Sequence, residues 1–235
     1  MTQLAIDTAG ANCSLALSFE REGQPCLLTR RVVRGRGQSD MVLPMARELL
    51  TEAGLAFKDL RHIYCTVGPG SFTGVRIGLA FAKGLEIAAC CQLYGVTSFF
   101  LLAETYFRDE KFETGERFAV VIDAGRGGLF VQSFEGAGDY YAPVDLPRLI
   151  AIEELEGYLS SHQIMKVIAS VAQTLAFEDR VVGRPWLLVE AEAEKLLSID
   201  QRHHIKEADV KPLYLRAADA KPQKGKSLRH VGDAT

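Results

Sequence analysis

The residues that most suggest chemistry are glycines directly after an apolar run. Residues 66–78 read TVGPGSFTGVRIG and follow the run His62-Ile63-Tyr64-Cys65. Glycine frees backbone N–H groups, and at the start of a helix such groups can bind a phosphate. The P-loop pattern G-x-x-x-x-G-K-[ST] is absent, however, and the glycine spacing departs by one residue from the dinucleotide-binding fingerprint. The segment therefore leaves two interpretations, a phosphate site or a loop that only shapes the chain.

Helix packing explains more of this segment than phosphate binding does. Gly74, Gly78 and Ala82 recur every four residues, so they line one side of the predicted helix. Small side chains allow another helix to approach closer than the usual distance of about 8–10 Å. Periodicity does not identify the surface that packs on this side of the helix. It is either this chain's own face of Met41, Met45 and Leu49 or a second protein.

Two aspartates end apolar strands in similar surroundings. If the two halves of the chain face each other, Asp7 and Asp123 would meet across a cleft and could hold a hydrated magnesium ion against phosphates. An aspartate after a strand is also an ordinary turn residue that accepts N–H bonds from its own loop. Both interpretations stay open for Asp7, and the structural one is favoured for Asp123.

The remaining reactive residue types form no recognisable metal or nucleophile motif. None of the five histidines is part of H-x-x-x-H or H-E-x-x-H. Ser71 lacks a G-x-S-x-G context and a nearby histidine, so we interpret it as a helix cap. We therefore predict no catalytic residue and no metal ligand.

Composition indicates a soluble globular protein. The chain has 235 residues, a net charge of −3 and 48% hydrophobic residues, so it has no overall basic field for nucleic-acid binding. Its five cysteines show no C-x-x-C spacing, which favours reduced thiols. The N-terminus does not resemble a signal peptide, and no run approaches the roughly 18 apolar residues of a membrane span. We expect a cytoplasmic protein that makes no membrane contact.

The pattern of apolar residues alternates between strands and helices. A hairpin is predicted first, and a polar segment, RDEKFETGER, predicts a domain boundary near residue 108. The tail from Ala217 has few large apolar residues and is expected to be mobile. The predicted strands are Gln3 to Ile6, Cys13 to Phe19, Leu27 to Arg34, Ile63 to Val67, Leu93 to Val96 and Lys166 to Ser170, and the predicted helices are Ser39 to Ala53, Ser71 to Cys90, Ser98 to Phe107, Ile152 to Ser160 and Glu190 to Leu197.

An internal similarity predicts two related halves. LAIDTAGANCSLALSFE, from Leu4 to Glu20, and VIDAGRGGLFVQSFE, from Val121 to Glu135, share a strand, an aspartate, a small-residue turn, a second strand and a closing Ser-Phe-Glu. Self-similarity of this kind is typical of duplicated architectures. We therefore predict two α/β lobes.

Several segments, taken in order, resemble the TsaB (YeaZ-type) family. They are LAIDTAGANCSLAL, QSDMVLPMARELL, VGPGSFTGVRIGLAFAKGLE, YGVTSF, VIDAGRGGLF and ADVKPLYLR, and they extend from Leu4 to Arg216. The resemblance implies an α/β fold of the actin, sugar-kinase and Hsp70 (ASKHA) type. Its expected parts are an N-terminal lobe over residues 1–107, a C-terminal lobe over 108–216 and a tail over 217–235.

The resemblance also implies a function. A member would be a non-catalytic subunit that supports a TsaD-type catalytic subunit in N6-threonylcarbamoylation of adenosine 37 in tRNAs that read codons beginning with A. A TsaE-type ATPase would complete the complex, tRNA would be contacted mainly through the complex, and the chain would form a homodimer when the partner is absent. The resemblance places the interface on Met41, Val42, Met45, Leu49, Gly70, Ser71, Phe72, Thr73, Gly74, Val75, Gly78, Leu79 and Ala82. On this interpretation, Gly78→Arg or Leu79→Asp should abolish partner binding and leave the fold intact.

Departures from the family pattern bear on nucleotide binding. Gln38 stands where relatives commonly have histidine, and the second-lobe turn contains an additional glycine, Gly125. We therefore expect no cofactor held by this chain alone; ATP or ADP would contact Asp7, Thr8 and Asp123 in a site shared with the partner. The alternative functions are an ATP-hydrolysing member of the fold, a glycoprotease-like peptidase and a homodimeric regulator.

Overall fold

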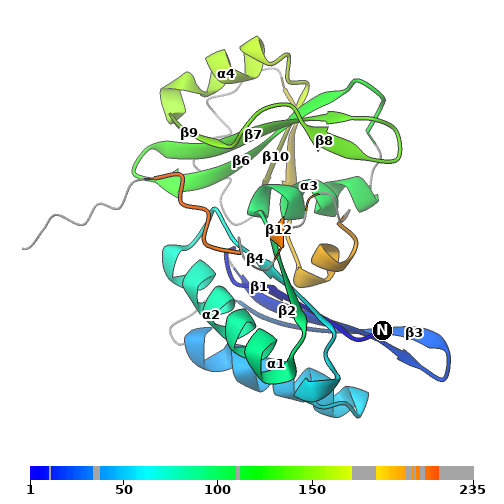
Figure 1. The fold of residues 1–235 in the computed structure, drawn as a ribbon. Helices are drawn as coiled ribbons and strands as arrows, with labels where there is room; N and C mark the ends of the chain where they lie inside the picture. The colour runs from blue at the N-terminus through cyan, green and yellow to red at the C-terminus, as the bar shows by residue number, and fades with distance from the viewer. Residues whose placement is uncertain are drawn as a thin grey trace, which may run out of the picture.

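Two mixed β-sheets form the frame of the chain. The structure is a computed structural model that describes residues 1–10, 12–33, 38–109, 112–170, 184–199, 203, 205–206 and 210–216. The strand order is β12-β5-β4-β1-β2-β3 in the first sheet and β11-β10-β6-β7-β8 in the second, where β9 also pairs with β7. Figure 1 shows the two sheets one above the other, with helices on their outer faces and between them.

The first sheet combines an antiparallel hairpin region with parallel strands. β1 pairs antiparallel with β2 and parallel with β4, which in turn pairs parallel with β5. Parallel neighbours need long crossovers, and the two helices α1 and α2 supply them. The bounds are β1 Gln3–Asp7, β2 Asn12–Arg21, β3 Gln24–Val33, α1 Gln38–Ala53, η1 Phe57–Asp59, β4 His62–Thr66, α2 Phe72–Ala89 and β5 Gln92–Val96.

The second sheet repeats this arrangement. β6 pairs antiparallel with β7 and parallel with β10, as β1 does with β2 and β4. The hairpin that was predicted twice from the sequence is therefore present twice. The bounds are α3 Ser98–Asp109, β6 Arg117–Gly125, β7 Gly128–Gly136, β8 Tyr141–Pro143, β9 Arg148–Ala151, η2 Ile152–Glu154, α4 Leu155–Ser161, β10 Lys166–Ser170, β11 Trp186–Val189, η5 Ala193–Leu197 and β12 Ile205–Lys206.

Alternating side chains divide the core into layers. In β1, Leu4 and Ile6 face α1 and α2, whereas Ala5 faces α3 and the second sheet. In β6, Val120 faces α3 and Val121 faces the outer helix α4. The molecule thus stacks α1 and α2, the first sheet, α3 with η5, the second sheet, and α4 (Figure 1).

The chain returns to the first lobe after the second sheet. η5 packs on β1 and β2, and the Ala193 amide donates to Ser14 Oγ at 2.9 Å. β12 pairs with β5, and the amide of Leu213 donates to the carbonyl of Val67 at 2.8 Å. Described parts of the predicted C-terminal lobe, 108–216, therefore contact the first lobe, and the predicted lobe boundaries stay a prediction. The predicted tail, 217–235, lies outside the described residues.

The main helix predictions are confirmed. Ser71 caps α2 by accepting a hydrogen bond from the amide of Gly74 at 3.2 Å, and Cys90 ends the helix in the left-handed conformation. The helix predicted over Glu190 to Leu197 is wrong in type, since only the short 3-10 turn η5 forms there. Within the described residues, no helix has both the length and the apolar character that crossing a bilayer demands.

Candidate functional site

The glycine-rich loop is packed against the β1–β2 turn. The amide of Ser71 donates to the carbonyl of Ala9 at 2.9 Å, and the amide of Gly74 is bound by the Ser71 side chain. A methyl group on Gly70 would overlap the carbonyl of Ala9. Because these amides already have protein partners, the loop shapes the chain, as the packing interpretation predicts.

The inner small-residue stripe of α2 faces its own lobe. A methyl group on Gly74 would overlap the carbonyl oxygen of Thr8, and one on Gly78 would overlap the Thr8 hydroxyl. That hydroxyl donates to the carbonyl of Gly74 at 2.7 Å. The stripe therefore permits the helix to lie on the end of β1, and the idea that it receives a partner helix is wrong.

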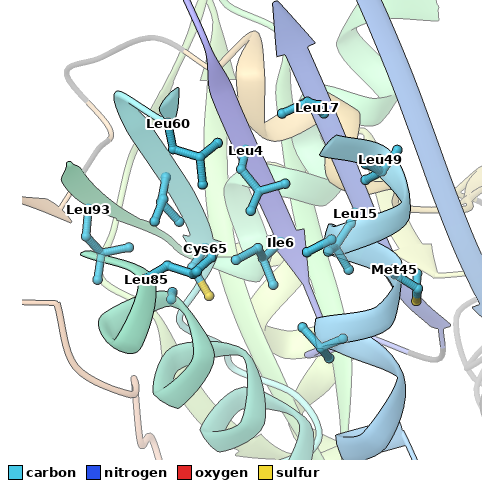
Figure 2. Close-up of a cluster of buried hydrophobic side chains, with 14 of the residues drawn as sticks. Leu4, Ile6, Leu15, Leu17, Met45, Leu49, Leu60, Cys65, Leu85 and Leu93 are labelled. Atoms are coloured by element: carbon cyan, nitrogen blue, oxygen red, sulfur yellow. The ribbon is translucent and has the colours of Figure 1, made fainter. Parts of the chain in front are cut away.

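Most apolar residues of the predicted interface lie in the core. Figure 2 shows Met45 and Leu49 of α1 among the leucines of the first sheet. A fully buried side chain offers no surface to a partner. The buried members of the predicted interface are Val42, Met45, Leu49, Gly74, Val75, Gly78, Leu79 and Ala82. Gly78→Arg and Leu79→Asp would consequently disrupt the lobe itself, contrary to the sequence-based expectation.

The opposite side of α2 is uncharged and open to solvent. We call it the outer face of α2; its helical positions are Thr73, Ile77, Ala80, Phe81, Gly84, Ile87 and Ala88. Ile77 and Phe81 are half-buried, the other five are exposed, and Ile87 is 78% exposed. Arg76 and Lys83 lie at one margin of this face. Of the predicted interface residues, Thr73 belongs to the outer face, and Phe72 and Met41 are also exposed.

The sequence patterns did not identify the outer face as the exposed side of α2, because the helix carries two small-residue stripes. Ala80, Gly84 and Ala88 recur every four residues, just as Gly74, Gly78 and Ala82 do. A methyl group on Gly84 would meet nothing within 4 Å. The absence of charge across the outer face was the available sequence signal.

Asp7 and Thr8 serve the first lobe and have almost no accessible surface. The Asp7 carboxylate accepts hydrogen bonds from Thr66 Oγ1 at 2.6 Å and from the Ala9 amide at 3.0 Å. Burial raises the pKa of this carboxyl, and the two hydrogen bonds oppose that shift. Asp7 and Thr8 thus serve turn formation and packing in the first lobe, and the predicted nucleotide contact stays a prediction.

Asp123 occupies the equivalent turn in the second lobe. Its Oδ1 accepts a hydrogen bond from the Gly125 amide at 2.7 Å, two residues on, as Asp7 does from Ala9. Asp123 therefore makes the turn hydrogen bond that the structural interpretation expects. Unlike Asp7, Asp123 is only half-buried and lines a cavity.

This cavity lies where the two lobes meet at the start of α2. Its volume is about 650 Å³. We call it the interlobe cavity; it is lined by Pro69, Gly70, Phe72, Val75, Arg76, Asp123, Ala124, Gly125, Arg126, Phe130, Leu213, Tyr214, Leu215 and Arg216. The sequence patterns did not indicate it, because its walls come from three distant segments.

Thiols and potential metal ligands are dispersed. The described residues contain no cluster of three or more His, Cys, Asp or Glu side chains that could hold a metal ion. All five cysteines are free thiols. Burial, with a smaller contribution from Asp7, raises the pKa of Cys13 to about 11, so this thiol stays protonated at neutral pH.

The duplicated sheets and their helices define a two-lobed α/β protein of the ASKHA class. The solved structure titled "YeaZ from Pseudomonas aeruginosa" matches with a TM-score of 0.73 and 26% sequence identity, covering 91% of this chain and 99% of that one. A second structure, described as similar to peptidase YEAZ from Pseudomonas aeruginosa, gives a TM-score of 0.74 over 92% of this chain. The predicted fold class is confirmed.

The sequence comparisons identify the family. A family model described as "TsaD: tRNA N6-adenosine threonylcarbamoyltransferase" matches residues 34–232. Proteins named "tRNA threonylcarbamoyladenosine biosynthesis protein TsaB" match from Haemophilus influenzae, with 25% identity over 92% of this chain and 94% of that protein, and from Escherichia coli, with 32% identity over 57% of this chain. The alignment with the Escherichia coli protein spans 55% of its length. The chain belongs to this family and, within it, to the TsaB (YeaZ-type) members.

Proposed function

We propose that this chain is a non-catalytic subunit in the synthesis of threonylcarbamoyladenosine in tRNA. It binds a TsaD-type catalytic subunit and supports N6-threonylcarbamoylation of adenosine 37 in tRNAs that read codons beginning with A. The names of the relatives from Haemophilus influenzae and Escherichia coli support the pathway. The sequence lacks the H-x-x-x-H metal-ligand motif. This favours a non-catalytic subunit over a metal-dependent catalytic one.

The observation that carries the proposal is the outer face of α2. A surface helix normally directs charged residues toward water, whereas seven positions here carry no charge. Ala80, Gly84 and Ala88 leave room for the backbone of another helix to approach closely. Ile87, at one end, supplies apolar area whose burial would stabilise the contact by roughly 25 cal/mol per Å². A helix of a homologous partner is the occupant that fits this face.

The other members of the complex follow from the same proposal. The TsaD-type subunit would carry the metal and transfer the threonylcarbamoyl group, a TsaE-type ATPase would join them, and tRNA would be held mainly by the complex in the cytoplasm. ATP or ADP would bind in a site shared with the partner. Without the partner, the outer face of α2 would pair with a second copy of the chain, because a homodimer can use the same patch twice.

The test places a large charged side chain on the outer face. Gly84→Arg adds it at a helical glycine with open space around it, so the fold is expected to remain intact. Gly157→Arg is the matched control, since Gly157 is an exposed glycine of α4 in the second lobe with equally open surroundings. The measurement is the affinity for the TsaD-type subunit of the same organism, by sedimentation of mixtures of the full chains.

Gly84→Arg is expected to weaken this association at least about tenfold, because a buried unpaired charge costs more than about 1.4 kcal/mol. Gly157→Arg should bind as the unchanged chain does. Equal affinity of the two variants would show that the partner binds elsewhere. The homodimer should be lost in Gly84→Arg as well, and it should dissociate when the TsaD-type subunit is added.

The enzymatic alternatives have less support. ATP hydrolysis by this chain alone would require an accessible Asp7 carboxylate to organise the phosphates, and that carboxylate is buried and bound by Thr66 and Ala9. A purified chain that hydrolyses ATP without a partner, and loses the activity in Asp7→Ala, would favour this alternative. A metal peptidase would need ligands at a helical spacing that the histidines lack.

A further inference from the structure

A short strap carries the chain from the second sheet back to the first. We call residues 190–197 the crossing strap; it begins directly after β11 and includes η5. η5 packs on α3 and on the strands β1 and β2, and Figure 1 draws it in gold below α3. Its buried side chains, Ala193 and Leu196, belong to the core cluster that both sheets share. The crossing strap therefore covers part of the common interior of the two lobes.

Three neighbouring side chains of the first sheet hold the crossing strap. Arg31 lies directly opposite Ser14 in the β2–β3 pair, and Asn12 lies two residues before Ser14 on the same face. Asn12 donates from Nδ2 to Oε1 of Glu190 at 2.9 Å. Ser14 Oγ accepts a hydrogen bond from the amide of Ala193 at 2.9 Å. One small area of β2 and β3 thus binds the strap at several successive residues.

Arg31 supplies the charge in this contact. Its Nη2 lies 2.7 Å from Oε1 of Glu190, and its Nη1 lies 2.8 Å from Oε1 of Glu192. The backbone at Glu192 is extended, with φ −128° and ψ 147°, and in extended chain alternate residues point to the same side. A single guanidinium can therefore bind both carboxylates through the fixed fork of its N–H groups.

The ionic part of this contact is open to solvent, whereas the neutral part is not. The exposed fraction of the side chain is 34% for Arg31, 48% for Glu190 and 36% for Glu192. Dissolved salt screens partly exposed ion pairs of this kind. Ser14 and Ala193 are buried and their hydrogen bond carries no formal charge, so salt should affect it little. Salt should therefore weaken one part of the contact selectively.

We propose that Arg31, Glu190 and Glu192 form a salt-sensitive latch that keeps the crossing strap closed over the shared interior. When the latch is released, the strap opens locally: η5 leaves β1 and β2 while both sheets stay folded. Local openings with a lower free energy than global unfolding are a general property of folded chains. The proposal does not depend on the outer face of α2 or on any partner protein.

The experiment is hydrogen exchange of single backbone amides, measured by NMR on the full chain under conditions where the rate reports the opening equilibrium. The Ala193 amide reports the strap, because its hydrogen bond to Ser14 breaks when the strap opens. The Leu4 amide reports global unfolding, because Leu4 lies in β1, which is paired on both sides. Arg31→Gln is expected to raise the exchange rate at Ala193 about tenfold at low salt, the effect of losing two partly exposed ion pairs.

Arg30→Gln is the matched control. Arg30 is the preceding residue of β3, its side chain is 35% exposed, and it pairs with two glutamates of α1, Glu48 and Glu52. These ion pairs remain intact when the strap opens, so Arg30→Gln should leave the exchange rate at Ala193 unchanged. Both variants lose native ion pairs, so both should accelerate exchange in strand β1 to a similar extent. A strap that opens locally accounts for this difference between the two amides.

Salt and a combined variant test the ionic origin of the effect. At about 1 M NaCl the Debye length falls to about 3 Å, so the unchanged chain should exchange at Ala193 almost as fast as Arg31→Gln does. Arg31→Gln combined with Glu190→Gln and Glu192→Gln should exchange no faster than Arg31→Gln alone, because the ion pairs are already absent.

The proposal is overturned if Arg31→Gln, shown to be folded by circular dichroism, leaves exchange at Ala193 unchanged. It is also overturned if Arg30→Gln accelerates exchange there equally, because the strap would then open only with global unfolding. A rate in the unchanged chain that does not respond to salt would exclude an ionic latch as well. If Arg31→Gln does not fold, Glu192→Gln removes one of the two ion pairs and takes its place in each comparison, with an expected acceleration of about threefold.

Discussion

The two small-residue stripes of α2 contain glycine for opposite reasons. Gly74 lies so close to Thr8 that a methyl group would overlap the carbonyl oxygen, whereas Gly84 faces open space. Only the first position therefore requires glycine for packing. The second keeps glycine although alanine would favour the helix, as expected where a partner needs a close approach.

Alanine substitutions at these two glycines should change stability in opposite directions. Gly74→Ala is expected to lower the free energy of unfolding by about 1–3 kcal/mol, because the helix must move away from β1. Gly84→Ala is expected to raise it by about 0.5–1 kcal/mol, because alanine loses less backbone entropy on folding. Urea denaturation of the isolated chain measures both values. Destabilisation of similar size at the two positions would contradict the assignment of the inner and outer sides of α2.

At the scale of elements, the sequence predicted what is local and missed what is distant. The hairpins, α1, α2 and α3 were predictable because apolar period, caps and turn residues lie within each segment. Which side of α2 is buried could not be predicted, because both sides carry small residues spaced four apart. The interlobe cavity and the return of η5 to β1 and β2 depend on contacts between residues far apart in the chain, which no local pattern encodes.

The contact of η5 with the first lobe can be tested at one hydrogen bond. Ser14 Oγ accepts from the amide of Ala193, and both residues are buried. Ser14→Ala leaves that amide without its partner, so the free energy of unfolding should fall by about 1–3 kcal/mol. Thr51→Ala is the matched control, because Thr51 is an exposed residue of α1 and its substitution should cost less than about 0.5 kcal/mol. If chemical denaturation gives equal values for the two variants, the contact does not hold η5 in place.

At the scale of the whole molecule, the two lobes share one interior. The cluster around α3 contains Ala5 and Ala16 of the first sheet together with Phe118 and Phe134 of the second. The segment from η5 to residue 216 adds contacts to both lobes, including Val210 in the first-lobe core. A chain built in this way should unfold cooperatively, because opening either lobe exposes apolar surface of the other.

A single core substitution can show whether the lobes unfold together. Leu4 is fully buried between the first sheet and its outer helices, and Leu4→Ala is expected to cost about 2–5 kcal/mol. Trp186, the single tryptophan, lies on β11 of the second sheet, so its fluorescence reports the opposite lobe. If the lobes are coupled, Leu4→Ala will lower the urea midpoint of tryptophan fluorescence as much as that of far-UV circular dichroism. Leu159→Ala, on the buried side of α4, provides the reciprocal control. An unshifted fluorescence midpoint in Leu4→Ala would mean that the second lobe folds independently and that the shared interior contributes little to its stability.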